Sequence, residues 1–193
     1  MNTQLSFKFD CRPAFSSDDF LIAPNNFEAV KWIDLWPNWP TSVICFCGPP
    51  GCGKTHLVEV FKVKAKAVAL EKEWFQKEFT EVPNPALIIE DFGARLSSSS
   101  EIAFFHLYNQ LVEINGHLLI TAERPPSMWD IDLKDLKSRL NSIIIAKIGP
   151  PDDTLISAVL VKMFADRQLR VTDQIISFAV THMERSFSSA RQL

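Results

Sequence analysis

The most specific chemistry in the chain lies in residues 48–55, whose sequence Gly-Pro-Pro-Gly-Cys-Gly-Lys-Thr matches the GxxxxGK[ST] pattern of a phosphate-binding loop. Backbone N–H groups of such a loop, together with the N-terminus of the helix that follows, surround the phosphates of a nucleotide. Lys54 would reach the β- and γ-phosphates, and the Thr55 hydroxyl would hold Mg²⁺. The pattern therefore predicts a site for ADP or ATP with Mg²⁺. The residues expected at this loop are Pro50, Gly51, Cys52, Gly53, Lys54, Thr55 and His56.

A pair of acidic residues, Glu90 and Asp91, directly follows an apolar run at 86–89. A Mg²⁺ site beside a phosphate-binding loop needs a carboxylate at the end of a neighbouring strand. We expect Glu90 to lie on the metal side and Asp91 to orient the attacking water. Because Glu90 is one methylene longer than the aspartate usual at that position, the pair predicts nucleotide binding with weak or no intrinsic ATPase activity. The alternative is a strand that ends in two solvated acids.

Three further side chains are suited to act on a phosphate. Thr121 and Glu123 end the apolar run at 117–121, where a polar group can sense the γ-phosphate or position water, and the pattern does not choose between them. Arg139 precedes the last apolar run, where a guanidinium can point at the nucleotide of a neighbouring subunit and contribute about 10³–10⁵ in rate. The alternatives are a plain strand end and a surface ion pair. The candidate catalytic residues are Asp91, Thr121 and Arg139.

Five short apolar runs rich in β-branched residues predict strands that are buried on both faces of a sheet. Segments with helical spacing alternate with them, and Ser98 with Glu101 fits a capping box at the start of one helix. This alternation predicts an α/β fold with a three-layer core around a five-stranded parallel sheet. The expected strands are 42–47, 66–70, 86–90, 117–121 and 142–148. The expected helices are about 26–35, 54–61, 101–115, 154–169, 172–181 and one that starts at 184.

Three parts are expected along the chain. Residues 1–19 form an extended N-terminal segment, and residues 20–149 form the nucleotide-binding core. After the joint at 149–151, which reads Gly-Pro-Pro, the pattern is purely helical. Residues 150–193 therefore predict a small helical lid.

Composition excludes several classes of protein. The formal net charge of −3 and the pI near 5.8 do not favour autonomous, non-specific DNA binding. The four cysteines show no CxxC spacing, so neither a zinc site nor a disulfide framework is expected. The N-terminus lacks the features of a signal peptide, and no apolar run approaches the roughly 18 residues of a membrane helix. We therefore expect a cytoplasmic protein that does not contact a membrane.

The N-terminal residues 4–9 form a candidate partner-binding peptide. In an extended chain Leu5, Phe7 and Phe9 share one face that can enter an apolar groove, while Gln4 can anchor the peptide by hydrogen bonds. The same alternation also fits an edge strand of the protein's own sheet.

Taken in order, several stretches resemble the AAA+ ATPases of the DnaA clade, and most specifically the Hda type, which comprises regulatory DnaA homologues without a DNA-binding domain. Only the phosphate-binding loop is highly specific by itself, but the ordered set covers almost the whole chain. The stretches that carry the resemblance are 19–26, 32–34, 36–37, 48–55, 121–126, 135–140, 149–153, 164–169 and 183–187.

The resemblance implies roles for particular residues. The segment 20–26 would lie against the adenine base through Phe20, Leu21, Ile22 and Asn26. Arg139 would be the arginine finger, and Arg185 the sensor-2 arginine of the lid.

The resemblance also implies partners. Proteins of this type bind the replicative sliding clamp through a peptide like Gln4, Leu5, Phe7 and Phe9. They then promote hydrolysis of the ATP held by DnaA, which makes them negative regulators of replication initiation. DNA would be reached only through the clamp, and a homodimer is compatible with the family.

Two other functions remain open at this point. One is a stand-alone ATPase or helicase loader, and the other is an adaptor that acts without nucleotide. The chain ends eight residues past Arg185, whereas the family's lid helix continues further, so a shortened lid is expected. No helix-turn-helix domain follows, which favours a regulator over an initiator. The preference for ADP or ATP is not decided by the sequence.

Overall fold

A parallel sheet built from short apolar strands forms the centre of the molecule. The computed structural model describes residues 11–12, 20–71, 82, 84–92 and 97–192. The sheet has the spatial order β4-β5-β6-β3-β7, and every neighbouring pair is parallel. Its strands are β3 (Val43–Cys47), β4 (Val68–Ala69), β5 (Ala86–Ile89), β6 (His117–Ala122) and β7 (Ile144–Lys147). The predicted five-stranded parallel sheet is confirmed, with shorter outer strands than expected.

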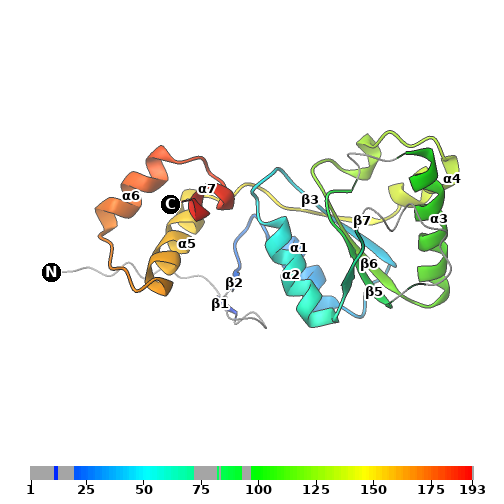
Figure 1. Cartoon of the computed structure of the whole chain (residues 1–193), viewed down its shortest axis with the longest axis horizontal. Helices are drawn as coiled ribbons and strands as arrows, with labels where there is room; N and C mark the ends of the chain where they lie inside the picture. Colours follow the sequence, from blue (N-terminus) through cyan, green and yellow to red (C-terminus); the bar gives the residue numbers. More distant parts are fainter. Residues whose placement is uncertain (1–10, 13–19, 72–81, 83, 93–96, 193) are drawn as a thin grey trace.

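Helices cover both faces of this sheet, as Figure 1 shows. On one face lie α1 (Phe27–Leu35) and α2 (Lys54–Ala65), and on the other lie α3 (Ser98–Glu113) and α4 (Lys134–Asn141), with the short 3-10 helix η2 (Pro126–Met128) before α4. Alternate residues of each strand face opposite layers, so β3 directs Cys45 toward α3 and Phe46 toward α2. Both layers are closely packed, which explains why the strands are apolar on both faces.

Aromatic side chains dominate each layer. On the α2 face the Phe61 ring stacks on Trp39 with 5.1 Å between centroids. On the α3 face Phe104 packs against Phe92 at 4.6 Å. These rings are almost wholly buried, and their burial is a large part of what holds helices and sheet together.

A smaller group of helices follows the last strand. It consists of α5 (Asp153–Asp166), α6 (Asp173–His182) and α7 (Phe187–Arg191), and it lies beside the core in Figure 1. We call these three helices the lid. Its hydrophobic cluster is small and has four buried members, which are Ile156, Leu160, Ile176 and Ala190. A short antiparallel pair of strands, β1 (Cys11–Arg12) and β2 (Phe20–Leu21), precedes the core.

The structure corrects two helix starts. Ser97, not Ser98, caps α3, since its hydroxyl accepts the Ser100 N–H at 3.3 Å. Glu101 makes no capping box; its buried carboxylate accepts the N–H groups of Asp132 at 3.2 Å and Leu133 at 2.8 Å, which ties α3 to the start of α4.

The second correction concerns the last helix. It begins at Phe187 and not at Glu184, because the Ser186 hydroxyl accepts the Ser189 N–H and caps the helix there. None of the helices in the described part of the chain is long and apolar enough to cross a membrane.

Candidate functional site

The phosphate-binding loop lies between β3 and α2, and its shape requires glycine. Gly51 and Gly53 have φ angles of 71° and 102°, in the left-handed region that other residues rarely adopt. A Cβ on Gly48 would lie 2.2 Å from the carbonyl oxygen of Ile148. The loop therefore keeps its backbone exposed toward the space above it, as a phosphate cradle needs.

Lys54 is the buried cation of this loop. Its side chain is 8% exposed, and its ammonium donates to the carbonyl oxygens of Gly48 at 2.8 Å and Pro49 at 2.9 Å. These acceptors carry no formal charge, so a phosphate would be a stronger partner for the ammonium. Gly53, at the N-cap of α2, has no side chain to cap the helix, which leaves the helix N-terminus suited to an anion. The loop fits a nucleotide phosphate.

A cavity of about 580 Å³ opens over this loop, a size that suits a nucleotide. The core contributes the loop, the β2–α1 connection and the ends of two strands, and the lid contributes α5 and α7. From the core the lining residues are Leu21, Asn26, Pro50, Gly51, Cys52, Gly53, Lys54, Thr55, His56, Leu57, Asp91 and Glu123; from the lid they are Leu155, Val159, Lys162, Met163, Asp166, Phe187, Ser188 and Arg191.

Most of the residues expected at the nucleotide meet in this cavity. All of residues 50–56 line it, and so do Leu21 and Asn26. The Asn26 side chain accepts the Ala23 N–H at 2.9 Å and donates to the Leu21 carbonyl at 3.0 Å, which fixes the turn that carries Leu21. Ile22 does not line the cavity, because it packs against the α1–α2 layer. The Phe20 side chain lies outside the described residues.

The structure separates the two acids at the end of β5. Asp91 lines the cavity and Glu90 does not. Neighbouring residues at a strand end point in different directions, so only one of the pair can face the loop. The expected metal-side role of Glu90 is therefore not supported by its position. Within the described residues no group of three or more His, Cys, Asp or Glu could hold a metal, so Mg²⁺ here would depend on Thr55, Asp91 and the phosphates themselves.

Thr121 and Glu123 are also separated. Thr121 is 1% exposed, and its hydroxyl accepts the Asp91 N–H at 3.0 Å. It therefore positions Asp91, whose φ of 51° is left-handed, and does not itself line the cavity. Glu123 does line it. Of the two sensor candidates, the geometry favours Glu123.

Arg139, at the end of α4, lies outside the cavity of its own chain. Its guanidinium lies 5.1 Å from the ring centroids of both Phe105 and Tyr108 on α3. Such cation–π contacts attract the guanidinium to the two rings and restrict where it can lie. No carboxylate in the described part of the chain forms an ion pair with it. The alternative of a surface ion pair is therefore not what the structure shows.

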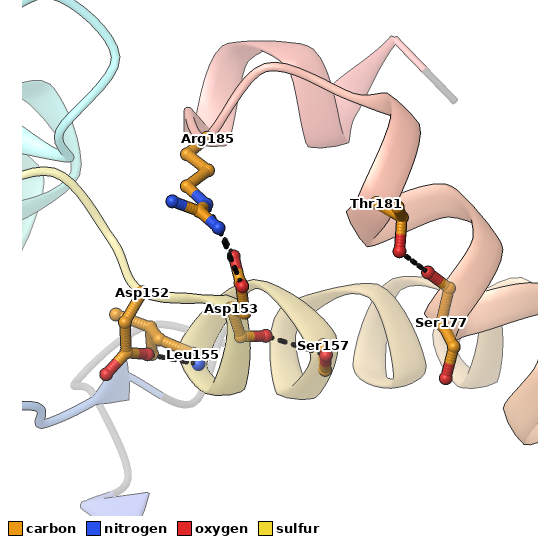
Figure 2. A network of polar contacts seen from close by, with 7 residues as sticks. All are labelled: Asp152, Asp153, Leu155, Ser157, Ser177, Thr181 and Arg185. Atoms are coloured by element: carbon orange, nitrogen blue, oxygen red, sulfur yellow. Dashed lines mark hydrogen bonds and ion pairs between the residues drawn. The ribbon is translucent and has the colours of Figure 1, made fainter.

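Arg185 does not reach the cavity either. Its Nε donates to Asp153 Oδ1 at 2.6 Å and its Nη2 to Asp153 Oδ2 at 2.9 Å, as Figure 2 shows. Both side chains are more than half exposed. Arg185 therefore lies outside the lining of the cavity, because the two-point pair holds its guanidinium at the start of α5. Its contact with a nucleotide stays a prediction.

None of the lid residues that line the cavity was predicted to be a site residue. Leu155, Val159, Lys162 and Asp166 follow one another at intervals of four, three and four along α5 and so share one face. That spacing is visible in the sequence, but it is equally typical of a face that packs on other helices. Only the position of the lid shows that this face borders the cavity.

Cys52 brings a thiol into the loop, and burial raises its pKa above the usual value, while the nearby Lys54 acts in the opposite direction. Burial likewise raises the pKa of Cys45 to about 12. Burial therefore favours the neutral form of both thiols. Gln4, Leu5, Phe7 and Phe9 lie outside the described residues.

The chain has the fold of an AAA+ P-loop NTPase. Its parallel α/β core carries a glycine-rich loop after a central strand and is joined to a helical lid that borders the cavity over this loop. No protein-family model matches the chain. In sequence it is 25% identical to the chromosomal replication initiator protein DnaA of Treponema denticola over 200 residues, which cover 90% of this chain and 42% of DnaA. The chain thus spans about two fifths of the length of that relative.

Solved structures of DnaA share the fold. Domain III of the Thermotoga maritima replication initiation protein DnaA superposes with a TM-score of 0.79 at 18% identity, over 94% of this chain and 86% of that one. AMPPCP-bound DnaA from Aquifex aeolicus gives 0.76 at 17% identity, over 94% of this chain and 64% of that one. The chain is therefore similar to the AAA+ part of DnaA, in sequence and in fold.

Proposed function

We propose that this chain is a DnaA-related regulator that binds ADP or ATP in its own loop and presents Arg139 to the ATP held by DnaA. In this role it would promote hydrolysis of that ATP and act as a negative regulator of replication initiation. The similarity to DnaA supports a place in replication initiation, since AAA+ domains related in this way can pair as neighbours in one assembly.

The observation that carries the proposal is the position of Arg139. It does not line the cavity of its own chain, its guanidinium lies 5.1 Å from the ring centroids of Phe105 and Tyr108, and it has no acidic partner among the described residues. A guanidinium held in this way can meet the phosphates of an adjoining subunit at little cost in side-chain ordering. Since it does not line its own cavity, its target would be a nucleotide on another protein.

The nucleotide bound in this chain's own loop would serve mainly to stabilise its folded structure. Lys54 and the α2 N-terminus would bind the phosphates, and Thr55 with Asp91 would hold Mg²⁺. AMPPCP in the Aquifex DnaA structure supports an adenine nucleotide as the ligand. A ligand at about 100 times its Kd stabilises the folded state by about 2.7 kcal/mol.

The sliding clamp is the proposed second partner. The alternating apolar residues Leu5, Phe7 and Phe9 would enter a groove on the clamp, with Gln4 as a hydrogen-bonding anchor. DNA would then be approached only through the clamp, in the cytoplasm.

The test of Arg139 is hydrolysis of DnaA-bound ATP in the presence of DNA-loaded clamp. The wild-type chain should accelerate hydrolysis, and Arg139→Ala should remove most of the acceleration, since such a finger contributes about 10³–10⁵ in rate. Lys137→Ala, an exposed cation on the same helix, is the matched control and should behave like wild type. If the wild-type chain leaves DnaA's hydrolysis rate unchanged, the regulatory proposal fails.

The clamp proposal is tested separately by a pull-down with the full chain. Gln4→Ala/Leu5→Ala should lose clamp binding, while Ser6→Ala/Lys8→Ala, on the opposite face of the extended peptide, should retain it. Equal recovery of clamp by wild type and the first variant would rule out residues 4–9 as the clamp-binding peptide.

A stand-alone ATPase is the second candidate, and the two acids at the cavity, Asp91 and Glu123, favour it. Its signature would be steady ATP turnover by the purified chain without clamp or DnaA. A nucleotide-independent adaptor would instead keep clamp and DnaA binding unchanged in Lys54→Ala.

A further inference from the structure

One side of α3 faces α4, the helix that carries Arg139, and the two helices pack beside each other (Figure 1). Glu101, Phe105 and Tyr108 are separated by four and three residues, so their side chains leave α3 in nearly the same direction. All three contact α4 or the residues at its start. We call these three residues the α4-facing side of α3.

Glu101 holds the beginning of α4. Its carboxylate belongs to a residue that is 4% exposed, and it accepts the N–H groups of Asp132 at 3.2 Å and Leu133 at 2.8 Å. Leu133 is the N-cap residue of α4 and has no polar side chain that could bind the backbone there. A carboxylate from α3 therefore binds this part of the backbone instead, and it fixes the start of α4 relative to α3.

Phe105 and Tyr108 contact the other end of the same helix. The guanidinium carbon of Arg139 lies 5.1 Å from the centroid of each ring. The Arg139 carbonyl accepts the Ser142 hydroxyl at 2.7 Å, so the backbone that carries this side chain is held as well. No acid in the described part of the chain pairs with the guanidinium. The two rings are therefore the contacts that restrict its direction.

Packing of the core does not by itself require aromatic residues at these two positions. Phe105 and Tyr108 are both half-buried and lie at the margin of the cluster on the α3 face of the sheet. An aliphatic side chain could cover the same margin, but only the π face of an aromatic ring attracts a guanidinium. The aromatic character of the pair therefore matters for Arg139.

We propose that Phe105 and Tyr108 are positioning residues for Arg139, which hold its guanidinium in the direction in which it meets the phosphates of DnaA-bound ATP. This inference rests on the proposed function, in which Arg139 acts on a nucleotide held by DnaA. Such a finger stabilises the charge of the transition state. Its orientation should therefore change the maximal rate of hydrolysis and leave the affinity of the chain for DnaA unchanged.

The test measures hydrolysis of DnaA-bound ATP against the concentration of the full chain, with DNA-loaded clamp present. Phe105→Leu/Tyr108→Leu should lower the maximal rate about tenfold, the combined effect of two cation–π contacts at a half-exposed site. The half-saturating concentration of the chain should stay within twofold of wild type. Tyr108→Leu alone should lower the maximal rate about threefold, and it replaces the double variant if that variant does not fold.

Two controls separate orientation of the guanidinium from packing. Phe105→Tyr/Tyr108→Phe exchanges the two rings and keeps both π faces, so it should restore the wild-type maximal rate. Ile102→Ala changes an exposed residue of α3 outside the α4-facing side, and it should behave like wild type. Circular dichroism checks that each variant is folded.

Failure of this inference and failure of the proposed function give different results. If the wild-type chain does not accelerate hydrolysis, or if Arg139→Ala accelerates it equally well, the proposed function is wrong and this inference falls with it. If Arg139→Ala loses the acceleration while the leucine pair keeps the maximal rate, only the positioning role is overturned. A leucine pair with a higher half-saturating concentration and an unchanged maximal rate would also overturn it, because the rings would then contact DnaA directly.

Discussion

The core and the lid bury their apolar residues to very different extents. In the core, helices cover both faces of the sheet, and residues such as Phe46 and Phe104 are fully buried within large clusters. The lid has four buried residues in its cluster, while Ile175 and Phe178 on α6 remain 51% and 65% exposed. Burial of apolar area is the main stabilising contribution to a fold, so the core can maintain its own structure more easily than the lid can.

The core and the lid contribute differently to the loop at residues 48–55. The loop conformation depends on the core, through left-handed glycines and the carbonyl contacts of Lys54. The lid reaches that loop through Phe187, by a backbone hydrogen bond to Gly51 and a ring contact with Gly53, and through Ser186 and Ser188, which lie close to Gly51. Residues of both regions line the cavity, so a nucleotide bound there would touch both, and its binding should order the lid more than the core.

The largest effect should come from a cavity in the core. Phe104→Ala removes a fully buried ring that packs on Phe92, and we expect a loss of about 3–5 kcal/mol in the free energy of unfolding. Urea denaturation measures it, and Ile102→Ala, on the same helix but 53% exposed, should change stability by less than about 0.5 kcal/mol. Similar values for the two variants would contradict the picture of a core that dominates stability.

A smaller and more local effect is expected in the lid. Ile176→Ala removes a residue that is 2% exposed, and it should cost the lid about 2–4 kcal/mol of local stability. Hydrogen exchange should then show loss of protection in α5 to α7 while amides of β3 and β6 keep theirs. Ile175→Ala, its half-exposed neighbour, is the control. Equal loss of protection in the sheet would mean that lid and core unfold as one unit.

The smallest effect belongs to the Arg185–Asp153 pair. Both partners are more than half exposed, so Arg185→Ala should lower stability by only about 0.2–1 kcal/mol. The difference should shrink at high salt, because exposed charges are screened. Thermal unfolding of Arg185→Ala and Asp153→Ala at two salt concentrations measures it. A salt-independent loss well above this range would show that the pair is a structural support of the lid.

Local patterns in the sequence predicted much of this structure. The phosphate-binding loop and the five strands depend on short stretches whose residue types suit one conformation, such as glycine at φ 71° or continuous apolar runs. The capping-box prediction failed because the side chain had two alternative sets of hydrogen-bond donors. Glu101 matched a capping box, but the backbone of Asp132 and Leu133 offered two buried donors in place of one exposed cap.

The same distinction, between features that a local pattern predicts and features that distant contacts decide, applies to the site residues. The sequence by itself determined the glycine-rich loop with Gly51, Gly53 and Lys54 and predicted a phosphate there, because the pattern is met within a few consecutive residues. Only the tertiary structure decided that Asp91 and not Glu90 faces that loop, and that Arg191 and not Arg185 borders it. Which of these residues borders the cavity depends on the direction of the chain at the end of β5 and on how α7 packs against the loop. The spacing of residues along one helix or strand does not determine how distant segments are oriented relative to each other.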